Sequence, residues 1–359
     1  MLHDVCQPTD YGRAVFEPLI TERLLVRPVE VGDVDALHER RNEPAVARLQ
    51  AWTVPYPRQR AESVIADAAA VDEPQDGQWW MATVVERATG AIVGDLVVHL
   101  SNGARTGEVG YSLASAHWGR GYAVEALSAL VGWLFDALPI TRLEGRLHPD
   151  NRASAMVLER AGFLFEGHTR LSFWLGDDNS DDWIYGMTRA DWEAWRDRPT
   201  SPPDQVGLVP ITLANKAEVL ALRTHRSQQA FVDPMPESLA DALLPDEYDG
   251  APLNPWLRAI EADGTIVGFT MLALPGEHLP EPYVWHLLID RMHQRRGIGV
   301  ATLVLLAEEC RELGARALRV SWTEGKGSPG PFYQRLGFVP TGRLMRGETE
   351  ARLLLGPHA

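Results

Sequence analysis

The chain has 359 residues, enough for two domains, and an apolar fraction of 45% that can build a core in each. Its 49 Asp and Glu residues outnumber 34 Lys and Arg residues, and the net charge of −15 argues against nucleic acid as a partner, because phosphate contacts need a positive face. The acidity favours a cationic amine or peptide, or serves solubility alone. No apolar run approaches the roughly 18 residues of a membrane span, and no signal peptide is visible, so we expect a cytoplasmic protein without a membrane partner.

The apolar pattern of the first half alternates between short strands and longer helices. We expect strands at Leu24–Arg27, Trp80–Glu86, Ala91–Val98, Glu108–Leu113 and Leu143–Leu147. One helix carries Ala123, Leu127, Leu130, Val131 and Leu134 on one face, and a second runs from Asn151 to Ala161 and stops at Gly162.

The second half repeats this order. We expect strands at Ile260–Ala262, Ile266–Leu272, Val284–Ile289 and Leu318–Ser321. One helix places Val300, Leu303, Ala307 and Cys310 on one face, and another precedes Gly337. The Pro-rich segment 197–205 is typical of a linker, which gives domains at 16–196 and 206–359. Each domain is predicted to be α/β, with a mixed, mostly antiparallel sheet flanked by helices.

Each half contains a glycine-rich loop that opens a helix. The first is Trp118-Gly119-Arg120-Gly121-Tyr122-Ala123, and the second is Gln294-Arg295-Arg296-Gly297-Ile298-Gly299. A Gly-Phe pair follows each loop at nearly equal distance, since Gly121 to Gly162 is 41 positions (162 − 121) and Gly297 to Gly337 is 40 (337 − 297). Such a loop presents free backbone N–H groups to an anion, here a pyrophosphate. The equal spacing indicates a duplicated domain.

Other chemistries find little support in the sequence. Cys6 and Cys310 form neither a disulfide framework nor a metal cluster, and the eleven His residues show no metal-ligand spacing, so we expect no metal. There is no Walker loop and no Gly-x-Ser-x-Gly elbow.

These motifs resemble the GCN5-related N-acetyltransferase (GNAT) superfamily, in tandem. The second loop matches the family's Gln/Arg-x-x-Gly-x-Gly/Ala pattern in full, whereas the first opens with Trp118. The first half looks like the branch that acetylates ribosomal-protein N-termini, in Thr21-Glu-Arg-Leu-Leu-Val-Arg-Pro28 and Leu158-Glu-Arg-Ala-Gly-Phe163. The second is more similar to a spermidine/diamine-type branch, in Gln229-Ala-Phe-Val-Asp-Pro234 and Trp285-His-Leu-Leu-Ile-Asp290.

The resemblance implies acetyl-CoA as the cofactor. It places backbone contacts to the thioester around Tyr111 and Ser112 in the first half and around Leu287, Leu288 and Ile289 in the second. The other implied contacts come from the two loops and from the following helix start, namely Trp118, Gly119, Arg120, Gly121, Ala123, Asn151, Ser154, Gln294, Arg295, Arg296, Gly297, Ile298 and Gly299.

Tyr333 is the first catalytic candidate, four residues before Gly337, where the family's tyrosine protonates the departing thiolate. A tyrosine packed in the core is the alternative. Leu158 holds the equivalent position in the first half and has no proton to donate, so Ser154 is the substitute there unless it only caps its helix. Glu108 and His286 are candidate general bases, and an exposed glutamate and a core histidine are the alternatives.

We therefore expect an N-acetyltransferase that transfers acetyl directly to a primary amine, with the C-terminal domain as the active one. The acceptor would be a polyamine-like small molecule or a peptide N-terminus, and a homodimer is a possible assembly. The alternatives are a tandem enzyme similar to mycothiol synthase, and an acetyl-CoA-binding sensor without activity.

Overall fold

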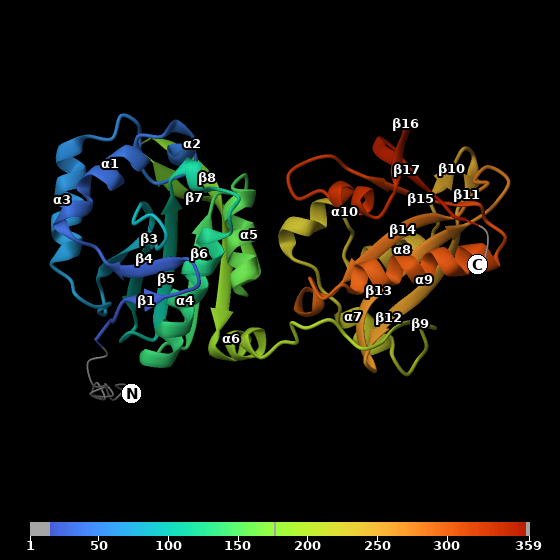
Figure 1. Ribbon diagram of the computed structural model, residues 1–359, viewed down its shortest axis with the longest axis horizontal. Coiled ribbons are helices and arrows are strands. Elements are labelled where there is room, and N and C mark those ends of the chain that lie inside the picture. Colours follow the sequence, from blue (N-terminus) through green and yellow to red (C-terminus); the bar gives the residue numbers. More distant parts are fainter. Residues whose placement is uncertain (1–14, 176, 357–359) are drawn as a thin grey trace, which may run out of the picture. The chain divides into compact units, whose positions relative to one another are not determined.

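The computed structural model describes residues 15–175 and 177–356. The chain divides into two compact units, the first ending at Arg196 and the second starting at Asp197 (Figure 1). Cys6 and the N-terminal segment, on which the signal-peptide prediction depends, lie outside the described residues. No helix among the residues described is long and apolar enough to cross a membrane.

The first unit is built on an eight-stranded sheet with the order β1-β2-β3-β4-β5-β6-β8-β7. All neighbouring strands pair antiparallel except β5 and β6, which run parallel. The strands are β1 (Leu19–Ile20), β2 (Leu24–Pro28), β3 (Trp79–Glu86), β4 (Ile92–Ser101), β5 (Thr106–Leu113), β6 (Arg142–Leu147), β7 (Leu164–Leu175) and β8 (Asp178–Thr188).

Helices cover both faces of this sheet (Figure 1). They are α1 (Val34–Arg41), α2 (Pro44–Ala47), α3 (Arg58–Ala69), α4 (Tyr122–Ala137), α5 (Arg152–Ala161) and α6 (Arg189–Arg196). On one face, Leu127, Leu130 and Leu134 of α4 are fully buried in the main core. On the other face, α1 and α3 pack against Met81 of β3 through a smaller apolar cluster that includes Ile65.

The second unit repeats the plan with seven strands in the order β16-β17-β15-β14-β13-β12-β9 and a separate hairpin of β10 and β11. Only β14 and β15 run parallel in the large sheet. The strands are β9 (Val206–Val209), β10 (Glu247–Tyr248), β11 (Ala251–Pro252), β12 (Asn254–Ala262), β13 (Thr265–Leu274), β14 (Tyr283–Ile289), β15 (Ala317–Trp322), β16 (Val339–Met345) and β17 (Glu348–Leu354).

Four helices flank this sheet, namely α7 (Lys216–Ala221), α8 (Met235–Leu243), α9 (Ile298–Glu312) and α10 (Gly330–Arg335). α7 and α8 bury Val219 and Met235 against one face. α9 and α10 bury Leu306 and Tyr333 against the other, together with Cys310. Both units are thus α/β, with mostly antiparallel sheets flanked by helices, and the predicted fold class is confirmed.

Candidate functional site

The parallel strand pair in the middle of each sheet separates before its strands end. β5 and β6 pair only as far as Glu108 and Glu144, although β5 runs on to Leu113. β14 and β15 pair only at Tyr283 and Val284, although β14 runs on to Ile289. Each sheet therefore has an internal edge at which backbone groups lack a neighbouring strand.

The strand register identifies the amides that face these edges. Ala114 donates to Val93, and Asp290 donates to Val267, at 3.0 and 2.8 Å. Since hydrogen-bonded positions alternate along an antiparallel ladder, Tyr111 and Leu113 point their backbone groups away from β4. Likewise Leu287 and Ile289 point theirs away from β13, whereas the amide of Leu288 belongs to that ladder. Of the expected thioester contacts, the amides of Tyr111, Leu287 and Ile289 therefore face the open edges, whereas those of Ser112 and Leu288 face the neighbouring strand.

Each glycine loop ends in a left-handed glycine that starts a helix. Gly121 (φ 81°) precedes α4, and Gly297 (φ 80°) precedes α9. The amides of residues 119–121 and 294–297 donate to no described residue, so both loops offer free N–H groups at a helix N-terminus. A Cβ at Gly297 would extend into open space. This arrangement fits a pyrophosphate, whose oxygens would take up these donors.

The different opening residues of the two loops make the same hydrogen bond. The Trp118 indole Nε1 donates to the Leu113 carbonyl at 2.9 Å, and the Gln294 amide Nε2 donates to the Ile289 carbonyl at 3.0 Å. In both loops the acceptor lies five residues earlier and belongs to the open strand edge. The departure of Trp118 from the family pattern therefore preserves the contact that ties loop to strand.

The three loop arginines differ in their surroundings. Arg120 has a half-exposed side chain 3.8 Å from Glu86, and the Arg295 side chain is exposed. Arg296 is buried, and its guanidinium donates to the Ser201 carbonyl at 2.7 Å. The Arg296 side chain is thus already hydrogen-bonded within the protein, so the cofactor contact predicted for Arg296 would come from its backbone amide.

In the second unit a cavity of about 750 Å³ joins the glycine loop to the open edge of β14. Tyr333 lines it from α10, with its ring packed against Trp322, Phe332 and Phe338. Its hydroxyl has no hydrogen-bond partner among the described residues. Burial raises the pKa of Tyr333, so the phenol keeps its proton at neutral pH. The Tyr333 ring thus belongs to the core while the residue also borders the cavity, and its role as the general acid stays a prediction.

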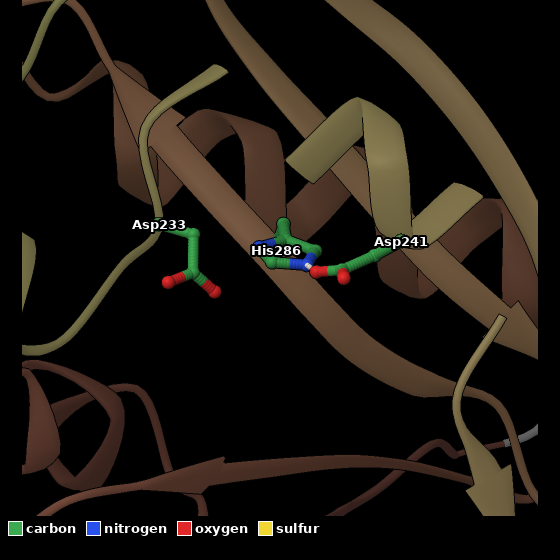
Figure 2. Close-up of side chains that lie close together, drawn as sticks. All are labelled: Asp233, Asp241 and His286. Atoms are coloured by element: carbon green, nitrogen blue, oxygen red, sulfur yellow. Dashed lines mark hydrogen bonds and ion pairs between the residues drawn. The ribbon is translucent and has the colours of Figure 1, made fainter. Parts of the chain in front are cut away.

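His286 also lines this cavity, but both of its ring nitrogens have neighbours. Its Nε2 lies 3.1 Å from the Asp241 carboxylate of α8. Figure 2 shows this pair, with Asp233 nearby on the loop before α8. Nδ1 lies 3.4 Å from the Ser238 hydroxyl. Burial lowers the pKa of His286 despite the surrounding carboxylates. Side-chain atoms of Asp233, Asp241 and His286 that could bind a metal ion lie within 4.8 Å of one another. Two of these residues, His286 and Asp241, are already hydrogen-bonded to each other.

A carboxylate that the sequence analysis missed completes this cavity. Glu348, the first residue of β17, accepts hydrogen bonds from the hydroxyls of Ser321 and Thr323. The Tyr283 hydroxyl lies 2.8 Å from that of Ser321 and extends this hydrogen-bond network. Glu348 belongs to the last hairpin, far along the sequence from the loop and from β14, so no local spacing signals it.

In the first unit a cavity of about 970 Å³ lies over β5 and contains Glu108. The Glu108 side chain is half-buried, and burial raises the pKa of its carboxyl, with Arg146 opposing and Glu144 adding to the shift. A carboxylate with a raised pKa is a better proton acceptor at neutral pH. Glu108 therefore has the position and the electrostatics of a general base.

Ser154 lies at the start of α5, where two different contacts hold it. The Asn151 side chain caps the helix by accepting from the Ser154 amide at 3.2 Å. The Ser154 hydroxyl lies 2.7 Å from the hydroxyl of Tyr111, a partner that no local motif predicts. Leu158 is buried and packs against Gly145. The Tyr111 hydroxyl from β5 and the Ser154 hydroxyl from α5 thus form a pair that carries protons in this unit.

Comparison with known proteins agrees with this geometry. Two family models match, an acetyltransferase (GNAT) domain at residues 23–164 and the acetyltransferase (GNAT) family at residues 222–338. The N-acetyltransferase p20 of Bacillus licheniformis is 30% identical over 157 residues, which is 43% of this chain and 86% of p20. The N-acetyltransferase YoaA of Bacillus subtilis is 28% identical over 176 residues, 49% of this chain and 98% of YoaA.

Among solved structures, a ribosomal L7/L12 α-N-protein acetyltransferase in complex with coenzyme A matches with 20% identity and a TM-score of 0.44, over 48% of this chain and 98% of that protein. The family models and p20 carry the assignment. Each of the two matched domains contains a glycine loop with free amides and an open strand edge, which agrees with this assignment. The chain belongs to the GNAT acetyltransferase family and is an N-acetyltransferase that uses acetyl-CoA.

Proposed function

We propose that the second domain transfers acetyl from acetyl-CoA directly to a primary amine. The observation that carries this proposal is the Tyr333 hydroxyl, which has no hydrogen-bond partner among the described residues and belongs to a residue lining the same cavity as the glycine loop and the open edge of β14. A general acid must reach the departing sulfur, and an already satisfied hydroxyl would be less available.

The bound cofactor supplies an activated acyl group as a thioester. The free amides of residues 294–297 and the N-terminus of α9 would hold its pyrophosphate. The outward amides of Leu287 and Ile289 would polarise the thioester carbonyl, as in an oxyanion hole. Tyr333 would protonate the sulfur, since a phenol with a raised pKa is fully protonated at pH 7.

The charges in the cavity favour a cationic acceptor of the polyamine type. Asp233 and Glu348 contribute carboxylates to its lining. Of the three arginines in the lining, Arg346 is paired with Asp246 at 2.5 Å, while Arg295 belongs to the glycine loop and Arg335 to the end of α10. An ammonium group would therefore meet carboxylates on this side of the cavity.

The first domain supports a second candidate, acetylation of a peptide N-terminus. Glu108, with its raised pKa, would accept the amine proton within a larger cavity. The acid is weaker here, because Leu158 replaces the tyrosine and the Ser154 hydroxyl is engaged with Tyr111. For the same reason this domain is the better candidate for an acetyl-CoA sensor. A mycothiol-synthase-like reaction, a cytoplasmic location and a homodimer remain predictions.

The experiment is a calorimetric titration of the full chain with acetyl-CoA, alongside release of coenzyme A thiol with 1,4-diaminobutane as the acceptor. We expect two sites in the wild-type chain. Gly297→Val should remove one site and the transfer, because a β-branched residue is strained at φ 80° and its side chain would enter the ligand's space. Gly121→Val is the matched control, expected to remove the other site and keep diamine transfer. Loss of transfer with Gly121→Val alone would refute the assignment to the second domain.

A further inference from the structure

A carboxylate is held at the point where β14 and β15 part. Val284 and Val320 are the last paired residues, and Ser321 is the next residue on β15. The Ser321 hydroxyl donates to Glu348, and the Thr323 hydroxyl donates to the other carboxylate oxygen at 2.9 Å. Glu348 is therefore fixed at the mouth of the internal strand edge where the thioester would lie.

Glu348 and Tyr333 border the same space. Both line the 750 Å³ cavity, and so do Ser321, Thr323 and Tyr283. Glu348 and Tyr283 both add to the raised pKa of Tyr333, which indicates that the carboxylate and the phenol are electrostatic neighbours. This arrangement suits one acetyl transfer, in which Glu348 would accept a proton from the amine while the Tyr333 hydroxyl stays free to donate one to the sulfur.

His286, the base that the sequence analysis expected in this domain, is less available. The His286 Nε2 is hydrogen-bonded to Asp241, and its Nδ1 faces the Ser238 hydroxyl. The ring is buried, with only 5% of the residue exposed. An incoming amine would have to displace one of these neighbours before His286 could take its proton.

We propose that Glu348 is the catalytic base of the second domain and the anchor of the acceptor's ammonium group, with Ser321 and Thr323 as its positioning residues. This inference rests on the proposed function of that domain. Glu348 accepts the first proton of the ammonium and leaves the neutral amine. As the C–N bond forms and the C–S bond breaks, Tyr333 gives its proton to the sulfur. The second nitrogen proton restores the phenol, and Glu348 releases the first to solvent, so one proton is released for each amide formed.

The test compares Glu348→Gln with Glu324→Gln in the full chain. Glu324 is an exposed carboxylate of the same unit that also accepts from a threonine hydroxyl, that of Thr349 at 3.0 Å, but it is not part of the cavity lining. The acceptor is 1,4-diaminobutane. Thiol release is followed from pH 6.5 to 9.5, and binding of the diamine is measured by calorimetry in the presence of coenzyme A.

Glu348→Gln should lower kcat at pH 7.5 about 100-fold or more, the usual effect of losing a general base. The deficit should shrink toward pH 9.5, because the fraction of neutral amine rises about tenfold per pH unit below the amine's pKa near 10. Diamine affinity should fall by about fivefold or more, while acetyl-CoA affinity stays within twofold. Glu324→Gln should behave like the wild-type chain in all of these measurements.

Ser321→Ala provides a second variant in case Glu348→Gln perturbs folding. It keeps the carboxylate but removes one of its donors, and a smaller loss of kcat with the same alkaline recovery is expected. Equal losses at every pH, or unchanged diamine affinity in Glu348→Gln, would overturn the assignment. If the wild-type chain itself transfers nothing to the diamine, to spermidine or to a peptide N-terminus, the proposed function fails and the base assignment fails with it.

Discussion

Replacing Tyr333 by Phe separates the chemical role of the hydroxyl from the packing of the ring. The ring contacts Trp322 and Phe338, with centroids 6.0 and 5.5 Å away, and Phe keeps both contacts. The hydroxyl has no described hydrogen-bond partner, so its removal should change the free energy of unfolding by no more than about 0.5 kcal/mol. Any large effect must therefore come from the reaction.

We expect kcat for diamine acetylation to fall about 100- to 1,000-fold at pH 7.5, the range for loss of a general acid, which corresponds to about 3–4 kcal/mol in the barrier. The thiol of the leaving group has a pKa near 8.5, so above that pH the thiolate can depart without a proton and the deficit should narrow. Thiol release between pH 6.5 and 9.5 measures this profile, and calorimetry with acetyl-CoA checks that the site is intact. Tyr248→Phe, in the same unit but outside the cavity lining, is the control.

Unchanged kcat in Tyr333→Phe at pH 7.5, with normal acetyl-CoA affinity, would refute the reasoning and return Tyr333 to a purely structural role. A uniform loss at all pH values together with weakened acetyl-CoA binding would show that the hydroxyl binds the cofactor rather than protonating the sulfur, and the assignment of Tyr333 as the acid would fail.

Three further predictions concern the first unit. Burial raises the pKa of Glu108, so its ionised form opposes folding at neutral pH. Glu108→Gln should therefore raise Tm by about 1–2 °C at pH 7.5. At pH 4, below the pKa of a glutamate in the unfolded chain, melting scans of the two proteins should give the same Tm. Arg40→Met strands the buried Asp95 carboxylate, its ion-pair partner, and should cost about 3–5 kcal/mol in urea unfolding; a loss under 1 kcal/mol would contradict a buried pair. Trp118→Gln should retain acetyl-CoA affinity by keeping a donor for the Leu113 carbonyl, whereas Trp118→Phe should weaken it about fivefold, and equal Kd values by calorimetry would refute that role.

The parts of the fold with strong apolar periodicity were predictable from the sequence. The core strands and the helices after the two loops have this periodicity, and β5, β14, α4 and α9 lie within a few residues of their expected positions. α3 and the long β7–β8 pair were missed, because α3 buries only Ala61 and Ile65, and half of β7 is exposed while none of its residues is fully buried. Elements that are half exposed to solvent have a weak apolar periodicity, and they are stabilised by packing against the rest of the domain rather than by their own sequence.

The candidate site divides in the same way. The glycine loops are local, and both open a helix as predicted, each after a left-handed glycine, Gly121 or Gly297. The strand separation, Glu348 and the Tyr111–Ser154 contact arise from segments far apart in the chain, and no spacing within one segment encodes them. The register also turns two of the expected amides, those of Ser112 and Leu288, away from the open edges, because which side of a strand an amide faces depends on its pairing.

The unfinished parallel pairing has a consequence for solubility as well as for binding. An exposed strand edge normally invites another chain to add a strand, and proteins blunt it with charges, bulges or a covering segment. Here each sheet keeps an open edge in its middle, between two strands of the same sheet. Donors that would be an aggregation hazard at the rim are thus held inside the sheet, where a bound cofactor rather than an added strand would take them up.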